Sequence, residues 1–444
     1  MTHEVTGRPE VTPEAFDHHS RAVATDPFGY FDALRRHGNV VRSELYGGFY
    51  TIVGYAAVSE ATRDGRTFSS EVAVDGTGCP VAGREGYGGT RLPSAAARSG
   101  FIDTDGPRHL HYRRLLLPWL TPRAMQKWEP EITKLAAEAV ESVRPSGSAE
   151  IVNDLASPVS AAIVMDIIGM PRTLGQQFSE ALHHLIGAPP DSPERTAAER
   201  LFGAVLVDVS AAIIERYEAP SGEDLISFLC RASGPDGTRL TPDDVIEQMR
   251  LFLAGGLDTT ASLITNTLIW LAGHPEQADR LRNEPELWPL ATEEFLRFTT
   301  PVLGLARTVD TDTVLDGVEL TAGDRLLLSF GAANHDPAEF DTPEEVILDR
   351  FPNRHLTFGV GAHRCIGSNM ARSVFQGVMP VILANCLDIR VDLDRAVRYP
   401  SVSVSNGWLS VPMTFTPAPE PVVPPPYSWR SETNPSDASQ EAPR

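Results

Sequence analysis

Cysteine is scarce in this chain of 444 residues, which has only Cys79, Cys230, Cys365 and Cys386. They lie far apart and form no C-x-x-C pair, so the sequence offers neither a disulfide framework nor the clustered ligands of a structural zinc site. This usage fits a reducing compartment, and we expect a cytoplasmic protein. The polar first 17 residues contain no apolar run of the kind that marks a signal peptide.

Positive charge is also in short supply. Lys and Arg total 38 against 59 Asp and Glu, which gives a formal net charge of −21, and the only lysines are Lys127 and Lys134. A chain this acidic is a poor candidate for binding nucleic acid or an anionic membrane surface. We therefore expect no nucleic-acid partner and no membrane partner, and we expect a monomer.

Glycine, by contrast, is concentrated around one cysteine. Residues 358–367 read F-G-V-G-A-H-R-C-I-G, so glycines flank Cys365 on both sides. Glycine permits positive φ and a close approach of the backbone, which lets such a loop direct N–H groups at the sulfur. A helix expected over residues 368–384 would place its positive end beside Cys365 and favour the thiolate, which suits a single metal position. The alternative is a buried structural cysteine in a glycine-rich turn.

The longest helical pattern runs from about residue 241 to residue 273. Thr241 and Pro242, followed by two acids, are a strong helix start. About 30 residues at 1.5 Å each extend about 45 Å, long enough to cross a membrane, but Asp258 near the middle would cost about 2.5–3.5 kcal/mol there. We expect a buried core helix instead. Because apolar residues surround Asp258 on the helical wheel, its carboxyl group is a candidate for a buried functional acid.

Two further pairs have helical spacing. His109 and Arg113 are four residues apart and would share a face that can clamp an anion, although a solvated face is the alternative. Glu294 and Arg297 are three apart and can form an ion pair, which alone is weak information because ordinary helices carry many such pairs.

Together these stretches resemble the cytochrome P450 family of haem-thiolate monooxygenases. The pattern F-G-x-G-x-H-x-C-x-G is similar to the family's haem-binding loop, and G-G-L-D-T at residues 255–259 is similar to its oxygen-activation motif. The motifs occur in the family's order between about residues 15 and 415. The resemblance implies a mainly α fold with a minor β region, as one triangular haem domain over residues 15–416. It would lie between a flexible arm, residues 1–14, and a Pro/Ser-rich tail, residues 417–444, that we expect to be disordered.

The resemblance also implies residue roles. The cofactor would be haem b (iron protoporphyrin IX), with Cys365 as the metal ligand. Contacts to the cofactor are expected from His109, Arg113, Ala254, Gly255, Arg307, Phe358, Gly359, His363, Cys365 and Gly367. Asp258 would relay protons, and Thr259 would donate a hydrogen bond where O2 binds. Glu294, Arg297 and Arg350 would form a structural set that supports folding and haem retention.

The implied activity is insertion of one atom of O2 into a small apolar organic substrate, because thiolate ligation favours O–O cleavage. Candidate pocket residues are Val74, Leu251, Val302 and Leu303, beneath a long loop, residues 75–100, whose arginines we expect to be solvated. The connection 183–194 is expected to be a mobile turn region. Two electrons would come from a ferredoxin or flavodoxin with its reductase, because no flavin or iron–sulfur domain fits in the chain. A basic docking patch is expected from Arg108, Arg114, Arg354, Arg364 and Arg372.

Two other functions stay open. A peroxide-driven haem peroxygenase is disfavoured by the intact pair Asp258 and Thr259, since that pair serves activation of O2. A non-enzymatic haem ligand sensor is disfavoured because the sequence has nothing that resembles a signalling output module.

Overall fold

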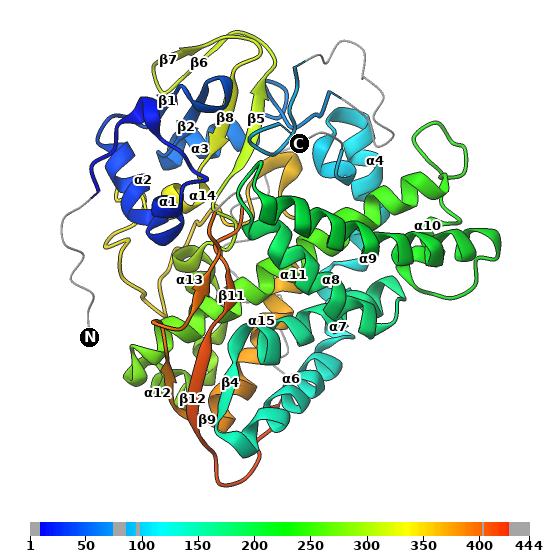
Figure 1. The fold of residues 1–444 in the computed structure, drawn as a ribbon, viewed down its shortest axis with the longest axis vertical. Helices are drawn as coiled ribbons and strands as arrows, with labels where there is room; N and C mark the ends of the chain where they lie inside the picture. The colour runs from blue at the N-terminus through cyan, green and yellow to red at the C-terminus, as the bar shows by residue number, and fades with distance from the viewer. Residues whose placement is uncertain (1–8, 74–85, 95–97, 402–403, 426–444) are drawn as a thin grey trace.

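Helix α11, Pro242–Ala272, runs through the middle of the molecule (Figure 1). The computed structural model describes residues 9–73, 86–94, 98–401 and 404–425. As predicted, Thr241 caps the helix: its hydroxyl accepts from the Asp244 backbone N–H, and the Asp244 carboxylate accepts from the Thr241 N–H. This capping box satisfies two backbone donors that the first turn leaves unpaired. The apolar length of α11 is buried among the helices around it, so it is a core helix.

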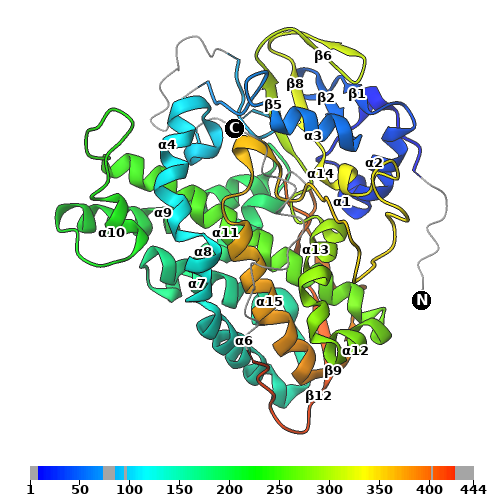
Figure 2. The same cartoon turned by 180° about the vertical axis from the view of Figure 1, so that it is seen from behind.

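The other helices surround α11 and taper towards one end of the molecule (Figure 1). The longer ones are α2 (Pro27–Arg35), α3 (Tyr55–Arg63), α4 (Gly106–Leu116), α6 (Glu129–Val143), α7 (Ser157–Ile168), α8 (Arg172–Gly187), α9 (Pro193–Glu218), α12 (Pro275–Asn283), α13 (Trp288–Thr299) and α15 (Ser368–Asn385). The short ones are α1 (Arg21–Thr25), α5 (Pro122–Gln126), α10 (Leu225–Leu229) and α14 (Phe330–Asn334). Figure 2 shows α15 from behind, running from the cysteine loop along the helical body beside α13.

The strands are a minor part of the fold and gather mainly at the broad end. A five-stranded sheet has the order β1 (Val40–Ser43), β2 (Phe49–Ile52), β8 (Arg325–Leu328), β5 (Leu305–Val309), β3 (Phe68–Ser69). All its neighbours are antiparallel except β2 and β8, which are parallel. A three-stranded sheet at the narrow end has the order β4 (Ser148–Glu150), β12 (Pro412–Pro417), β9 (Cys386–Val391). Two-stranded pairs join β6 (Thr313–Leu315) to β7 (Val318–Leu320) and β10 (Val397–Arg398) to β11 (Trp408–Ser410).

One region differs from the sequence prediction. The region expected to be a turn, residues 183–194, is mostly helical, because α8 continues to Gly187 and α9 begins at Pro193. The apolar stretch Ile151–Ile168 is divided into a π-helical segment, η6 (Ile151–Ala156), and α7. This stretch is long and apolar enough to span a membrane, but 78% of it is buried inside the protein, as in a core helix.

The described C-terminal residues are held by hydrogen bonds beyond the predicted start of the tail at residue 417. Ala418 is buried, and its backbone N–H donates to the Asn385 carbonyl. The Asn385 side chain in turn bonds both the N–H and the carbonyl of Val422. The hydrogen-bonded chain therefore reaches at least Val422, and residues 426–444 of the predicted tail lie outside the described residues.

Candidate active site

Cys365 lies in the loop between the short helix η8 (Gly361–His363) and α15. Its backbone N–H donates to the Phe358 carbonyl at 2.7 Å, which closes the loop beneath the sulfur. Gly359 and Gly361 have φ of +62° and +75°, where side chains are disfavoured. A Cβ on Gly361 would also lie 2.9 Å from the Arg63 Cα, so this position accepts glycine alone. The loop thus folds as the glycine spacing predicts.

The thiol of Cys365 is set deep in the protein with one side uncovered. Protein atoms surround the sulfur closely, and this burial raises the pKa of the thiol, although the residue as a whole is exposed. The Gly367 backbone N–H donates to the sulfur, and it and nearby arginines oppose the effect of burial. The helix end favours the thiolate, as predicted, but desolvation is the larger effect. Coordination to a metal removes a thiol proton outright.

A single-ligand site is what this part of the chain provides. Among the described residues, no group of three or more His, Cys, Asp or Glu side chains is placed to hold a metal ion. Arg113 lies near enough to Cys365 to interact with it electrostatically. Cys365 therefore fits a metal whose remaining ligands come from a cofactor.

Arg307 on β5 tests whether an anionic cofactor fits this site. It is 2% exposed, and the one hydrogen bond of its guanidinium to a described residue runs from Nη1 to the Ala306 carbonyl. Burial lowers the pKa of Arg307 to about 10, and the carboxylates of Asp105 and Asp103 only partly offset this. A buried cation without an ion-pair partner is costly. The carboxylates of haem would supply the missing negative charge, so the residues present fit the group.

The rings of the two predicted histidines, His109 and His363, are in contact, with centroids 3.9 Å apart and planes tilted by 48°. His363 Nε2 is 2.9 Å from Asp105 Oδ1, while its Nδ1 has no hydrogen-bond partner among the described residues. His109 faces the carbonyls of Phe101 and Ala362 through its two ring nitrogens, at 3.1 and 3.0 Å. His109 therefore braces the cysteine loop from α4, and its contact with the cofactor stays a prediction.

The middle of α11 presents one glycine to open space and one to its neighbours. A Cβ on Gly255 would meet nothing within 4 Å. A Cβ on Gly256 would lie 2.9 Å from Val164 and 3.2 Å from Met370, so this residue lets α7 and α15 approach. Ala254 is half-buried beside Gly255, and the Thr259 hydroxyl donates to the Gly255 carbonyl at 2.9 Å. The small residues of the motif leave α11 uncovered at Gly255, as a bound haem would need.

Asp258 is fully buried, as the helical wheel predicts, and its partners come from distant parts of the chain. Oδ1 accepts a hydrogen bond from the Tyr399 hydroxyl and lies 3.5 Å from His183 Nε2, whereas Oδ2 has no partner among the described residues. Gly187 and Gly407 fix the Tyr399 ring, because a Cβ on either would lie within 3 Å of it. Nothing in the local sequence of His183 or Tyr399 marks either residue as a partner of Asp258.

Glu294, Arg297 and Arg350 form the predicted structural set. Arg297 Nε and Nη2 each donate to Glu294 at 2.8 Å, and Arg350 Nε donates to it at 3.0 Å. Asn353 adds a bond at 3.0 Å, and the Ile347 N–H another at 2.9 Å. Arg297 and Arg350 also donate to backbone carbonyls in the segment before the cysteine loop. The set ties α13 to that segment.

Arg372 does not belong to a surface patch, contrary to the prediction. It is buried on α15 and makes a bidentate pair with Glu293 of α13, with both N–O distances 2.6 Å. His355 Nε2 is 3.1 Å from the same carboxylate, and Arg372 also lies over the Phe358 ring at 4.6 Å. This second ion pair anchors α15, the helix that follows the cysteine loop.

The other predicted patch arginines differ in exposure. Arg114 is exposed, the Arg354 side chain is 64% exposed, and Arg108 is 40% exposed with a 3.8 Å contact to Asp244. Arg364 is half-buried beside the cysteine. The patch is therefore smaller than predicted.

The predicted substrate residues are divided between open and packed positions. Leu251 and Val302 are half-buried, and Leu251 contacts the loop at Gly100, where a Cβ would lie 2.8 Å from its own. Leu303 is 2% exposed and packs into the core beside Gly331, which leaves little of it accessible to a ligand. Val74 lies outside the described residues.

Arg91 and Arg98, which were predicted to be solvated, are packed against the protein instead. Arg98 is 4% exposed, and Arg91 is half-buried with Nη2 donating to Ser99 at 3.0 Å. Arg84 lies outside the described residues.

Comparison with known proteins supports the family resemblance seen in the sequence. A family model for Cytochrome P450 matches residues 208–392. A steroid C26-monooxygenase from Mycolicibacterium smegmatis is 30% identical over 373 residues, which are 84% of this chain and 88% of that protein. Cytochrome P450 130 of Mycobacterium tuberculosis is 31% identical over 400 residues, 88% of this chain and 95% of that protein. The chain belongs to the cytochrome P450 family.

The solved structure of cytochrome P450 CYP109Q5 from Chondromyces apiculatus superposes on this P450 with a TM-score of 0.77 and 26% identity, over 92% of this chain and 100% of that one. The mainly α fold with a minor β region is thus confirmed. This P450 is a haem-thiolate monooxygenase with haem b as its cofactor. It acts on an organic substrate with O2 and electrons from a redox partner.

Proposed function

We propose that this P450 inserts one oxygen atom into an apolar, largely aliphatic small molecule, with a steroid as the first candidate. The observation that carries the chemistry is the lone thiol of Cys365, which accepts from the Gly367 N–H and is open on one side. Half-buried Leu251 and Val302 support an apolar substrate. The steroid candidate rests on the relative named a steroid C26-monooxygenase.

Several residues would hold the cofactor. Cys365 would bind the iron through its thiolate, while Arg113 and Arg307 would pair with the haem carboxylates. Gly255 leaves α11 open where a Cβ would otherwise project. Haem, when bound, supplies the activation of O2 and the transfer of oxygen. The protein supplies positions, protons and an apolar pocket.

Asp258 and Thr259 would move the protons. The free Oδ2 of Asp258 can take up a proton and pass it on, because no described donor or acceptor occupies it. The Thr259 hydroxyl is bonded to the Gly255 carbonyl, so it must turn away from the helix before it can donate to a ligand. A positioned acid of this kind typically contributes about 10²–10⁴-fold to a rate.

Electrons would arrive from a ferredoxin or flavodoxin with its reductase, on the face near Arg114 and Arg354, which are exposed. We further propose that the protein works as a cytoplasmic monomer. Size-exclusion chromatography with light scattering checks the oligomeric state.

Spectroscopy and product analysis test this function. The purified protein, reduced and exposed to carbon monoxide, should show the red-shifted Soret band of thiolate ligation, and Cys365→His should abolish that band. Steroids, fatty acids and small aromatics should then be screened by difference spectroscopy, and each binder incubated with isotopically labelled O2, ferredoxin and reductase. A product with one labelled oxygen supports the proposal. Efficient turnover with hydrogen peroxide, and none with O2 and electrons, would instead indicate a peroxygenase.

A further inference from the structure

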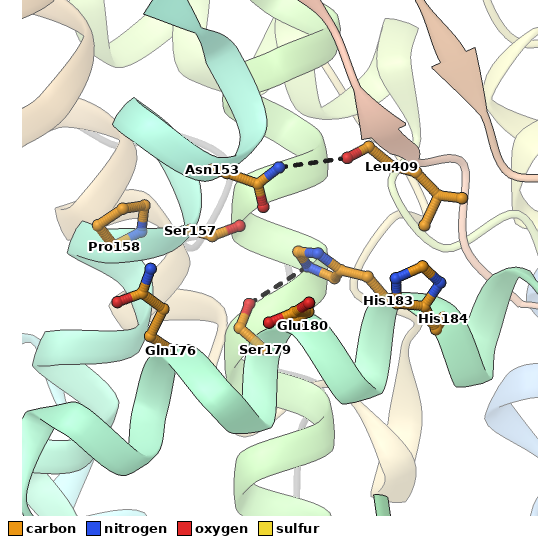
Figure 3. Close-up of a pocket in the computed structure, with 9 residues that line it drawn as sticks. All are labelled: Asn153, Ser157, Pro158, Gln176, Ser179, Glu180, His183, His184 and Leu409. Carbon is orange, nitrogen blue, oxygen red and sulfur yellow. Dashed lines mark hydrogen bonds between the residues drawn. The ribbon is translucent and has the colours of Figure 1, made fainter. Parts of the chain in front are cut away.

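A polar cavity of about 320 Å³ lies beside α8 (Figure 3). Its walls come from the junction of η6 and α7, from α8, and from β11. Besides Pro158 and Leu409 it is lined by polar residues: Asn153, Ser157, Gln176, Ser179, Glu180, His183 and His184. Because a water molecule occupies about 30 Å³ of liquid, a polar space of this size holds several waters.

The α8 wall passes from exposed to buried towards α11. Gln176, Glu180 and His184 are exposed and, at spacings of four, form one stripe along the helix. Ser179 and His183 form the adjacent stripe and are 3% exposed. Figure 3 shows the His183 ring projecting from α8 across the cavity. The cavity therefore connects a solvent-facing stripe with a buried one.

Ser157 gives independent support for water in the cavity. It is 6% exposed, and its hydroxyl has no hydrogen-bond partner among the described residues. A buried hydroxyl without a partner is costly, and a bound water is the usual solution in a polar space.

His183 lies between the cavity and the buried acid of α11. Its Nε2 is 3.4 Å from Ser179 Oγ and 3.5 Å from Asp258 Oδ1. The second distance is longer than a good hydrogen bond, so proton transfer requires an approach of a few tenths of an ångström or one intervening water. Tyr399 donates to the same Oδ1, which leaves Oδ2 free on the other side of the carboxylate.

We propose that His183 carries protons from this cavity to Asp258, so that the space between η6/α7, α8 and β11 is the proton entrance of the enzyme. The proposal rests on the proposed function, in which Asp258 delivers protons to the active site. A cavity water protonates Nδ1 of the imidazole, and the Nε2 proton passes to Asp258 Oδ1. The cavity water then takes back the Nδ1 proton while a second water supplies one to Nε2, which restores the first tautomer. Each cycle moves one proton and leaves the imidazole unchanged.

The groups that set the protonation of His183 surround it on several elements. They are Asp258 on α11, His184 and Glu180 on α8, Glu150 at the start of η6, and Tyr399 after β10. Burial lowers the pKa of His183, and Asp258 opposes that effect. Burial likewise keeps the pKa of Tyr399 well above its usual value, so Tyr399 stays protonated and acts as a fixed donor. Of the two residues, His183 is thus the neutral one that can pass a proton on.

His183→Gln and His183→Phe separate the relay from the hydrogen bond. Glutamine keeps an N–H donor near the position of Nε2 but cannot pass a proton through, whereas phenylalanine removes both functions. We expect donor-dependent O2 consumption by the holoenzyme to fall about tenfold or more in both variants, with a larger solvent isotope effect in D2O. His37→Gln, which removes an exposed imidazole just after α2, should stay within about twofold of the wild type. Wild-type rates and isotope effects in both His183 variants would overturn the proposal.

A second measurement does not depend on turnover. Nuclear magnetic resonance of isotopically labelled histidine in the reduced carbon monoxide complex reports the titration of His183, assigned by its absence from His183→Gln. Asp258→Asn should lower the pKa of His183, because it removes the opposing negative charge. An unchanged titration would overturn the coupling. A wild type without the thiolate Soret band would contradict the proposed function instead, whatever the His183 variants do.

Discussion

Two buried carboxylates, Glu294 on α13 and Asp258 on α11, show how differently this protein uses the same chemical group. Both residues are 0% exposed. Glu294 accepts hydrogen bonds from two arginines, an asparagine and a backbone N–H. Asp258 has one firm donor, Tyr399, a histidine at 3.5 Å and one oxygen without a partner. A saturated carboxylate is fixed and structural, whereas one with a free oxygen can still exchange a proton.

The largest expected effect is on the saturated site. Glu294→Ala leaves Arg297 and Arg350 buried without their anion, and breaking such a pair costs about 3–5 kcal/mol. We expect a matching loss in the free energy of unfolding measured with urea, together with loss of bound haem. Glu284→Ala, which removes an exposed partner of Arg280, should cost less than about 1 kcal/mol. Similar losses for the two variants would remove the contrast between buried and exposed pairs.

Asp258→Asn should produce the opposite pattern. The substitution keeps the shape of the side chain, so we expect the free energy of unfolding to change by no more than about 1 kcal/mol. Turnover with O2 should nevertheless fall about 10²-fold, because the amide cannot deliver a proton. Steady-state product formation, measured beside urea unfolding of the same preparation, provides the comparison. A variant that loses stability while keeping its turnover would show that Asp258 is structural.

Thr259→Ala should have a smaller effect, on coupling. The hydroxyl donates to the Gly255 carbonyl of its own helix, so its loss should leave folding almost unchanged. We expect consumption of O2 and reductant to continue while product per electron pair falls severalfold, about what one lost hydrogen bond of 1–1.5 kcal/mol allows. Thr259→Ser, which keeps the hydroxyl, should restore most of the coupling. Full coupling in Thr259→Ala would remove this residue from the proton path.

The smallest expected effect is on the pH dependence of stability. Burial lowers the folded-state pKa of His18 and His335 from 6.5 to about 3, so their contribution is complete above pH 6.5 and is lost as the pH falls. Despite burial, the ion pairs lower the pKa of Glu294 from 4.5, so its contribution is lost below that pH. We expect the urea midpoint to decline below pH 6.5 and more steeply below pH 4.5. A urea midpoint that stays constant between pH 7 and pH 4 would contradict the assignment of acid sensitivity to these groups.

The sequence predicts well whatever is encoded in short stretches. The capping box at Thr241, the glycine-dependent loop at Cys365 and the Glu294–Arg297 pair each depend on residues a few positions apart. Local backbone geometry then decides the structure, and the prediction needs no knowledge of the rest of the chain.

Contacts between segments far apart in the sequence cannot be predicted from local patterns. Asp258 and Tyr399 are 141 residues apart, and Glu293 and Arg372 are 79 apart. Their pairing depends on how α11, α13 and α15 pack, which periodicity does not specify. The same limit explains why Arg372 was expected at the surface and Arg98 in solvent, although both are buried.

The raised pKa of Cys365 has a consequence for how the enzyme is assembled. Since the protein alone favours the neutral thiol, uptake of haem must expel a hydrogen ion from the sulfur. Binding of haem should therefore acidify a weakly buffered solution, and the affinity for haem should increase as the pH is raised. Assembly of the holoenzyme is therefore coupled to deprotonation of the Cys365 thiol.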